Sequence, residues 1–205
     1  MTAEADGTVT AVLHDTIPEA QFREEVAGRK RLVDAALQLT STFDRNKLLQ
    51  LIMSLAAELL DAETSSLILL DEETSELVIT VASGEVGAKA ERRRIPIEAG
   101  IAGWTLANRQ VAVVDNPASD ERFFPGIGEA LGFTTENLLA VPMLVKDRAI
   151  GVVEIINKRT STGFTERDVE LATAFASIGA IAIDNAQLYA ELANAVLTAR
   201  MSYRL

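Results

Sequence analysis

One carboxylate interrupts an otherwise apolar segment of this 205-residue chain. Glu154 lies in GVVEIINK (151–158), and strict alternation places it on one strand face with Ile150, Val152 and Ile156. An unpaired charge in an apolar interior is costly, so this face either borders a polar pocket or is partly solvated. The first alternative makes Glu154 a candidate ligand-binding residue.

Two glycines open a second candidate site. Gly100 and Gly103 in GIAGW (100–104) allow the start of a helix to approach a ligand with its unpaired backbone N–H groups exposed, which favours an anion. The alternative is that both glycines only permit close packing of a helix on a sheet.

Two adjacent aromatic residues, Phe123 and Phe124, lie in an irregular stretch over 115–136. Between Arg122 and Pro125 they could close over a cavity as a mobile lid. The alternative, which is compatible with a lid's hinge, is that one ring anchors the loop on the core.

Residue types missing from the chain exclude several chemistries. The chain has no cysteine and a single histidine, His14. We therefore expect no thiol catalysis, no disulfide, no Cys/His metal site, no haem and no covalently attached bilin. No Ser/His/Asp or acid–base set converges either, so we expect a protein that is not an enzyme.

Charge and hydropathy restrict the classes of binding partner and the cellular compartment. The net charge of −11 provides no positive field for phosphate backbones or anionic lipid, so we expect neither nucleic acid nor a membrane as partner. No apolar run reaches the roughly 18 residues of a membrane span, and the polar start MTAEADGTVT does not resemble a signal peptide. These features predict a cytoplasmic protein.

The elements that must position these residues follow from periodicity and turn signals. After a flexible tail over 1–15, we expect helices at 16–41, 44–60, 100–110 and 165–203, and strands at 66–70, 77–82, 93–97, 111–114, 138–145 and 149–157. Thr165 suits the N-cap of the last helix, with Asp168 as the acid three residues on. Strand pairs joined by tight turns, with helices at both ends, predict an antiparallel α+β domain.

Three segments, in this order, carry a family resemblance: GIAGW (100–104), DERFFPGIGEALGFTTEN (120–137) and GVVEIINK…F…D (151–168). They resemble the GAF domain of cyclic nucleotide phosphodiesterases and adenylyl cyclases, a small-molecule-binding regulatory module. The resemblance covers 43–189 and leaves an N-terminal linker or dimerisation helix over 16–42 and a helical extension over 190–205. It implies a GAF (PAS-like) fold, in which a central six-stranded antiparallel sheet has the terminal helices on one face and short helices and loops over a ligand pocket on the other.

The resemblance also implies site residues. The contacts it implies come from the backbone of Ile101 and Ala102, which receives a cyclic phosphate in similar domains, and from Ser66, Phe123, Phe124, Thr135 and Glu154. In similar domains the position of Glu154 accepts a hydrogen bond from the sugar or base. Asn157, Lys158, Phe164 and Asp168 match the family's signature, which implies a Lys158–Asp168 ion pair beneath the pocket, although Val169 replaces the acid that follows in the signature.

The chain departs from cyclic-nucleotide-binding relatives at three ligand positions. Ala82 and Ser83 stand where relatives have a stacking aromatic residue and an acid, and Leu131 replaces a threonine. The missing ring alone removes a stacking contact worth about 1–3 kcal/mol. The ligand is therefore a cyclic nucleotide, another small molecule, or absent.

The last helix has a heptad seam with one polar position, at Asn185. Its members are Leu171, Phe175, Ile178, Ala182, Asn185, Tyr189, Leu192, Val196, Ala199 and Tyr203. We expect the half up to Ile183 to cover the domain's own sheet, and the half beyond Tyr189 to form a homodimer or connect to an output domain.

The sequence as a whole leaves two functions open: a sensory domain that signals through its terminal helices, or a ligand-free dimerisation domain of a larger signalling protein. The chain would be either a free-standing regulator or part of a longer protein.

Overall fold

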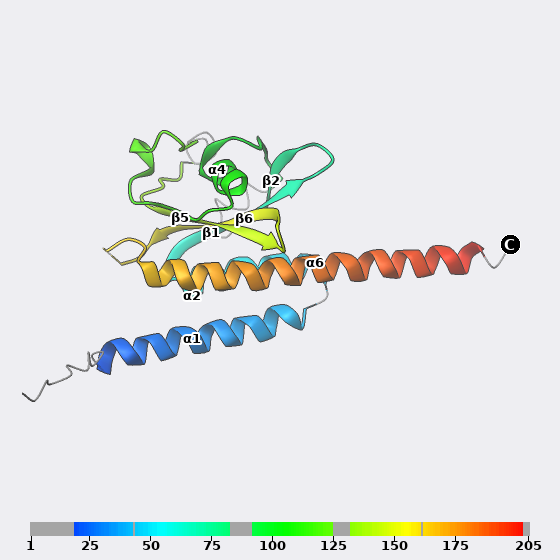
Figure 1. Cartoon of the computed structure of the whole chain (residues 1–205), viewed down its shortest axis with the longest axis horizontal. Helices are drawn as coiled ribbons and strands as arrows, with labels where there is room; N and C mark the ends of the chain where they lie inside the picture. The colour runs from blue at the N-terminus through cyan, green and yellow to red at the C-terminus, as the bar shows by residue number, and fades with distance from the viewer. Residues whose placement is uncertain (1–18, 43, 83–91, 125–131, 161, 203–205) are drawn as a thin grey trace, which may run out of the picture.

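The computed structural model describes residues 19–42, 44–82, 92–124, 132–160 and 162–202. Figure 1 shows the arrangement in layers: a short helix, α4, above a curled sheet, two helices, α2 and α6, below it, and α1 below those. This is an α+β fold with a six-stranded antiparallel sheet, as predicted.

All six strands of the sheet pair antiparallel, in the order β3-β2-β1-β6-β5-β4. The strands are β1 (Ala62–Asp71), β2 (Glu76–Ala82), β3 (Arg94–Pro96), β4 (Ala112–Val114), β5 (Leu138–Val145) and β6 (Arg148–Lys158). The central strand β6 therefore carries Glu154. Gly151 in β6 must remain glycine, because a Cβ there would lie 2.4 Å from the Ile68 carbonyl oxygen.

The helices are α1 (Glu19–Thr40), α2 (Arg45–Leu59), α4 (Gly100–Asn108) and α6 (Glu166–Ser202), with one 3-10 turn, η1 (Pro117–Ser119). Asp44 caps α2, since its carboxylate accepts a hydrogen bond from the Lys47 backbone N–H at 3.1 Å. The predicted start of the first helix, at residue 16, lies outside the described residues.

The sheet separates two apolar clusters. The face turned to α1, α2 and α6, here called the helical face, packs Leu67, Val141 and Ile155 against side chains such as Leu39, Ile52 and Phe175. The opposite face, here called the α4 face, packs Ile68, Ala140 and Val152 against Ile101, Ala102 and Leu106 of α4. Because successive strand residues alternate between these faces, the register decides which side chains can meet a ligand beneath α4.

The alternation predicted for β6 fails at one residue. Between β5 and β6 the register shifts, so that Met143 pairs with Gly151 and Leu144 pairs with Ala149. Ile150 is left unpaired by this bulge and packs with the helical-face cluster, whereas Val152 and Ile156 remain on the α4 face. The predicted companion Ile150 was therefore wrong, and Val152 and Ile156 were right.

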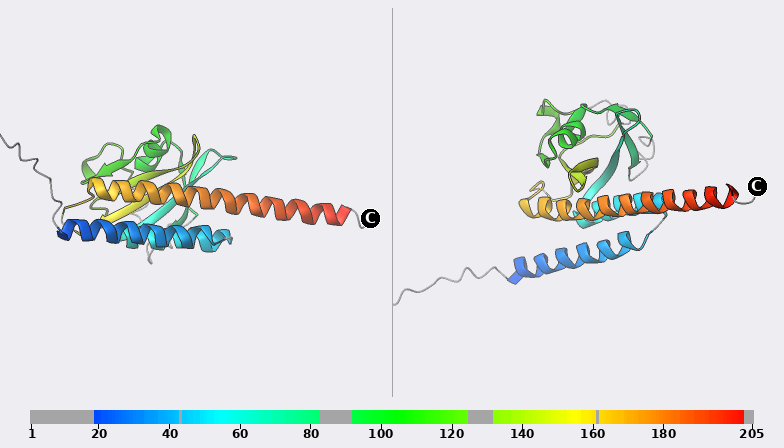
Figure 2. Two further views of the ribbon diagram at one scale, coloured as in Figure 1. Left: turned by 60° about the horizontal axis from the view of Figure 1, so that its bottom comes forward. Right: turned by 45° about the vertical axis from the view of Figure 1, so that its right-hand side comes forward.

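Helix α6 has two halves with different surroundings. Phe175 and Ala182 are buried under the sheet, which supports the covering role predicted for the first half. From Gln187 to Ala199 every residue is exposed, and this half extends beyond the sheet in Figures 1 and 2. Among the described residues, Glu166–Ala199 alone is long and apolar enough for a membrane span, which is weak evidence because 44% of its tested window is buried inside the fold.

Candidate ligand-binding face

Glu154 reaches the α4 face from the middle of β6. Its cross-strand neighbours there are Ser66 on β1 and Ala140 on β5, both small. The Ser66 hydroxyl donates a hydrogen bond to Glu154 Oε2 at 3.1 Å. Ser66 and Glu154, each predicted separately as a ligand contact, thus lie side by side, and the residues opposite Glu154 on both neighbouring strands are small.

Burial changes the protonation of this carboxyl group. Desolvation raises the pKa of Glu154 from 4.5 to about 7, and the hydrogen bond from Ser66 opposes the rise only in part. Nothing described on the strands that flank Glu154 compensates the charge, because both cross-strand neighbours, Ser66 and Ala140, are neutral. Near neutral pH the group is therefore divided between a neutral acid, which can donate, and a carboxylate, which can only accept.

Helix α4 covers this face with its glycine-containing first turn. Gly103 permits very close packing, because a Cβ there would lie 2.5 Å from the Ile97 carbonyl oxygen. Gly100 has a φ of +72°, which other residues rarely adopt. Ile101 and Ala102 follow and are buried. Of the two alternatives for these glycines, close packing accounts for Gly103, and an anion site at the backbone N–H groups of the first turn stays a prediction.

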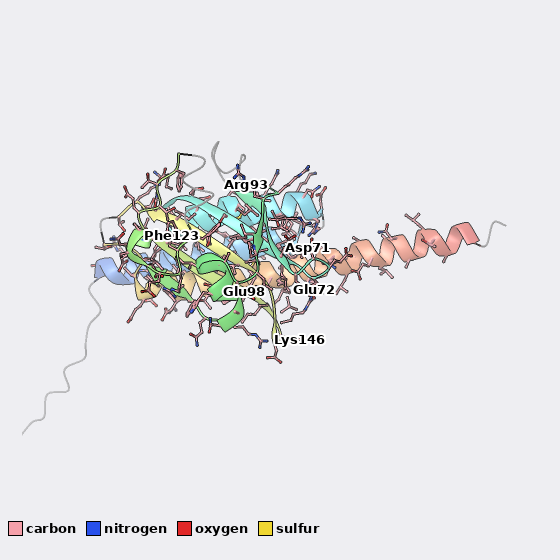
Figure 3. The ribbon with its side chains drawn as sticks, turned by 90° about the horizontal axis from the view of Figure 1, so that it is seen from above. Asp71, Glu72, Arg93, Glu98, Phe123 and Lys146 are labelled. Carbon is pink, nitrogen blue, oxygen red and sulfur yellow. The ribbon has the colours of Figure 1, made fainter. Side chains whose placement is uncertain are left out.

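The loop aromatics differ from each other in burial. Phe123 packs against the α4-face cluster, whereas Phe124 is 49% exposed. Figure 3 shows Phe123 beside α4 on this side of the sheet. One ring therefore anchors the loop on the core, as the second alternative predicted, and the other contacts solvent.

Asn157 orders the segment that carries Thr135. It has a φ of 58° and is buried; its Oδ1 accepts from the Glu136 backbone N–H at 2.8 Å, and its Nδ2 donates to the Thr134 carbonyl at 2.9 Å. In the opposite direction, Asn137 Oδ1 accepts a hydrogen bond from the Lys158 backbone N–H at 2.8 Å. Thr135, half-buried, is thus held between two points of attachment to the end of β6.

The predicted ion pair joins the last residue of β6 to the first turn of α6. Lys158 Nζ lies 2.6 Å from Asp168 Oδ1, and only 10% of each side chain is exposed. Asp168 Oδ2 also accepts from the backbone N–H and the hydroxyl of Thr165, at 2.8 and 2.9 Å. Lys158 lies 6.0 Å from the ring centroid of Phe164. Asp168 therefore serves both as ion-pair partner and as helix cap, and both interpretations were right.

A family model for the GAF domain matches residues 44–184 of the chain. The chain belongs to the GAF domain family. It is 29% identical over 147 residues to a probable 3',5'-cyclic phosphodiesterase of Caenorhabditis elegans, a match that covers 67% of this chain and 20% of the relative. It is 36% identical over 104 residues to a cGMP-specific 3',5'-cyclic phosphodiesterase of Drosophila mojavensis, covering 50% of this chain and 9% of the relative.

Solved GAF structures share the fold. The GAF domain of a phosphoenolpyruvate-protein phosphotransferase from Coxiella burnetii superposes with a TM-score of 0.74 at 18% identity, covering 82% of this chain and 98% of that one. A free methionine-R-sulfoxide reductase from Neisseria meningitidis, solved with its substrate, gives a TM-score of 0.68 at 18% identity over 81% and 93% of the two chains. GAF domains are regulatory and sensory modules, and this chain spans a fifth or less of the phosphodiesterases that it matches.

The structure describes only the backbone of one of three predicted ligand positions of this GAF domain, and it does not describe the other two. The backbone of Ala82 pairs with Ser66, while Ser83 and Leu131 lie outside the described residues. Across 19–42, 44–82, 92–124, 132–160 and 162–202, no group of three or more acidic or histidine side chains could hold a metal ion. The expectations about ligand stacking, haem, bilin and metal therefore stay predictions.

Two residues on α4 were missed by the sequence reasoning. The Thr105 hydroxyl is buried and has no hydrogen-bond partner in the described part of the GAF domain. Trp104 carries the guanidinium of Arg122 over its ring, 4.5 Å from the centroid. A helical wheel drawn from Gly100 would have placed Thr105 near the buried side of the helix, but nothing in the sequence indicated that Arg122 returns to Trp104.

Proposed function

We propose that this GAF domain binds a small molecule on the α4 face and passes its bound state to the terminal helices of a dimer. The observation that carries the proposal is Glu154, a half-buried carboxyl group on the α4 face whose partner on the strands beside it is the Ser66 hydroxyl. A native fold rarely retains such a group without a use for it, because an apolar residue would fill the same place at less cost.

Two further features, together with Glu154 and Ser66, support a ligand with an anionic end and a polar end. The first turn of α4, with Ile101 and Ala102, offers backbone N–H groups to an anion. The buried Thr105 hydroxyl lacks a described partner and offers a further polar contact. Glu154 and Ser66 together accept and donate hydrogen bonds at the other end.

A thermal-shift screen of the full chain tests this proposal. Cyclic nucleotides are the first probes, because the relatives are named as cyclic phosphodiesterases, and other nucleotides and small metabolites follow. A ligand at a hundred times its dissociation constant adds about 2.7 kcal/mol, which raises the melting temperature by about 5–10 °C. Glu154→Gln should reduce this shift, and Glu73→Gln, in an exposed turn, should not. No shift with any probe, and no co-purified ligand in native mass spectrometry, would remove the sensory function.

The second half of α6 favours dimerisation, with or without a ligand. Tyr189, Leu192 and Val196 are 57%, 61% and 43% exposed, at the three- and four-residue steps of the predicted seam. Such a stripe in water favours association with a second copy or connection to an output domain. Sedimentation velocity of the full chain should report a dimer. A dimer whose melting temperature no ligand changes would leave the structural dimerisation domain as the function.

The charge of the chain supports the remaining expectations. The net charge of −11 gives this GAF domain no overall positive field to attract nucleic acid or anionic membranes, so we propose a cytoplasmic protein that binds neither.

A further inference from the structure

Arg122 links the loop over 120–124 to the tryptophan of α4. Arg122 donates from Nε to Asp120 Oδ1 at 2.9 Å and from Nη2 to Asp120 Oδ2 at 2.7 Å, while its guanidinium lies over the ring of Trp104. The same guanidinium lowers the pKa of Asp120 to about 2, so the pair is charged across the working pH range.

The two contacts of Arg122 have different consequences. Asp120 and Arg122 belong to the same loop, so their ion pair fixes the plane of the guanidinium but attaches the loop to nothing else. The contact with Trp104 is the one that crosses from the loop to α4. A planar guanidinium held by two parallel hydrogen bonds is already oriented for stacking on an aromatic face, whereas a lysine ammonium is not.

The same loop also covers the first residue of α4. A Cβ on Gly100 would lie 3.1 Å from the Cβ of Phe124 and 4.0 Å from the Arg122 carbonyl oxygen. Phe123, between them, packs against the α4-face cluster. The loop therefore lies against the first residue of α4 at Phe124, and one turn later it contacts Trp104 through Arg122.

We propose that Arg122 is a positioning residue of the ligand site, which clamps the 120–124 loop onto α4 and so fixes the first-turn N–H groups at the edge of the α4 face. This role rests on the proposed function, because those N–H groups are where an anionic ligand would bind. Asp120 orients the clamp, and Trp104 receives it.

Amide hydrogen exchange of the full chain without ligand tests the clamp. Two amides report on the clamp: that of Phe123, which donates to the Asp120 carbonyl at 2.9 Å, and that of Gly103, which donates to the Ala99 carbonyl at 3.1 Å. In Arg122→Ala we expect both to exchange about tenfold faster, which equals about 1.4 kcal/mol. Amides of β5 and β6 should keep their rates. Arg122→Lys should behave like Arg122→Ala, because charge alone does not restore stacking.

Arg94→Ala is the matched control. Arg94 on β3 also bridges two carboxylates, Asp71 and Glu76, each at 2.8 Å, but stacks on no ring of a described residue. Its loss should therefore leave the exchange rates at Phe123 and Gly103 unchanged. Trp104 is the only tryptophan in the chain, so its emission and its quenching by acrylamide report the clamp directly and should change in both Arg122 variants. If Arg122→Ala does not fold, Trp104→Leu removes the same contact from the other side.

The outcomes separate this inference from the proposed function. Unchanged exchange at Phe123 and Gly103, full rescue by lysine, or faster exchange spread evenly over the sheet would overturn the clamp, whatever the ligand screen finds. Locally faster exchange with no ligand found would support the clamp and contradict only its use in binding.

Discussion

Replacing Glu154 by glutamine should stabilise the protein at alkaline pH and leave its acid stability nearly unchanged. The amide has the shape of the carboxyl group and can still accept the hydrogen bond of Ser66, but it cannot ionise. The variant therefore removes one quantity, the cost of holding a charge under α4.

The magnitude follows from the pKa of Glu154. It is about 7 in the folded protein, against 4.5 as the ordinary value. Below pH 4.5 the group is protonated in both states and adds no pH dependence. Between pH 4.5 and 7 the unfolded chain releases the proton while the folded one keeps it, so stability falls as pH rises, and the loss is complete above pH 7. A difference of about 2.5 pKa units corresponds to about 3 kcal/mol.

Melting curves or urea titrations at several pH values measure this difference. The free energy of unfolding of Glu154→Gln should equal that of the wild type at pH 4.5 and exceed it by about 3 kcal/mol at pH 8.5. This difference corresponds to about 6–12 °C in melting temperature. Other carboxyl groups titrate in both proteins and cancel in the comparison. Glu73→Gln should show no such gain, because Glu73 is exposed. If the difference in unfolding free energy between Glu154→Gln and the wild type is the same at all pH values, this carboxyl group is not desolvated and the reasoning fails.

Two further predictions concern the helix that leaves the domain. Asp168→Asn should lower the free energy of unfolding by about 3 kcal/mol in urea titrations, because it leaves Lys158 without its buried partner and weakens the cap at Thr165; a loss below about 1 kcal/mol would show that the pair is solvated. Leu192→Glu should move the sedimentation of the full chain toward the monomer without changing the melting temperature of the domain, and an unchanged sedimentation coefficient would exclude this stripe from the interface.

The element order could be predicted from the sequence because each strand and helix has its own local signal. The strand predicted at 138–145 has the bounds of β5, and the second helix begins at its cap Asp44, where its start was predicted. Bulges and strand ends were less predictable: β1 begins at Ala62, four residues before the prediction, and Ile150 changes face at a bulge that depends on pairing with β5. Pairing between strands is a tertiary property, so no periodicity within one strand reveals it.

The site was predictable where chemistry conflicts with its surroundings. Glu154 in an apolar strand is such a conflict, and the structure shows it hydrogen-bonded to Ser66, whereas the ligand contacts that the resemblance implied for both stay predictions. Thr105 and the contact of Arg122 with Trp104 could not be predicted, because a threonine in a helix is ordinary and the loop's return path is set by packing. The exposed half of α6 matched its pattern, but a pattern does not identify its partner.

Chemical-shift mapping by NMR tests the central claim most directly. In a titration of the labelled protein with each hit of the ligand screen, or with cGMP and cAMP if there is none, the account predicts saturable shifts at Ser66, Ile101, Ala102, Thr135 and Glu154. Shifts confined to the cleft between α1 and α6, lined by Glu25, Arg29, Arg167, Glu170 and Leu171, or no shifts at all, would contradict a ligand on the α4 face.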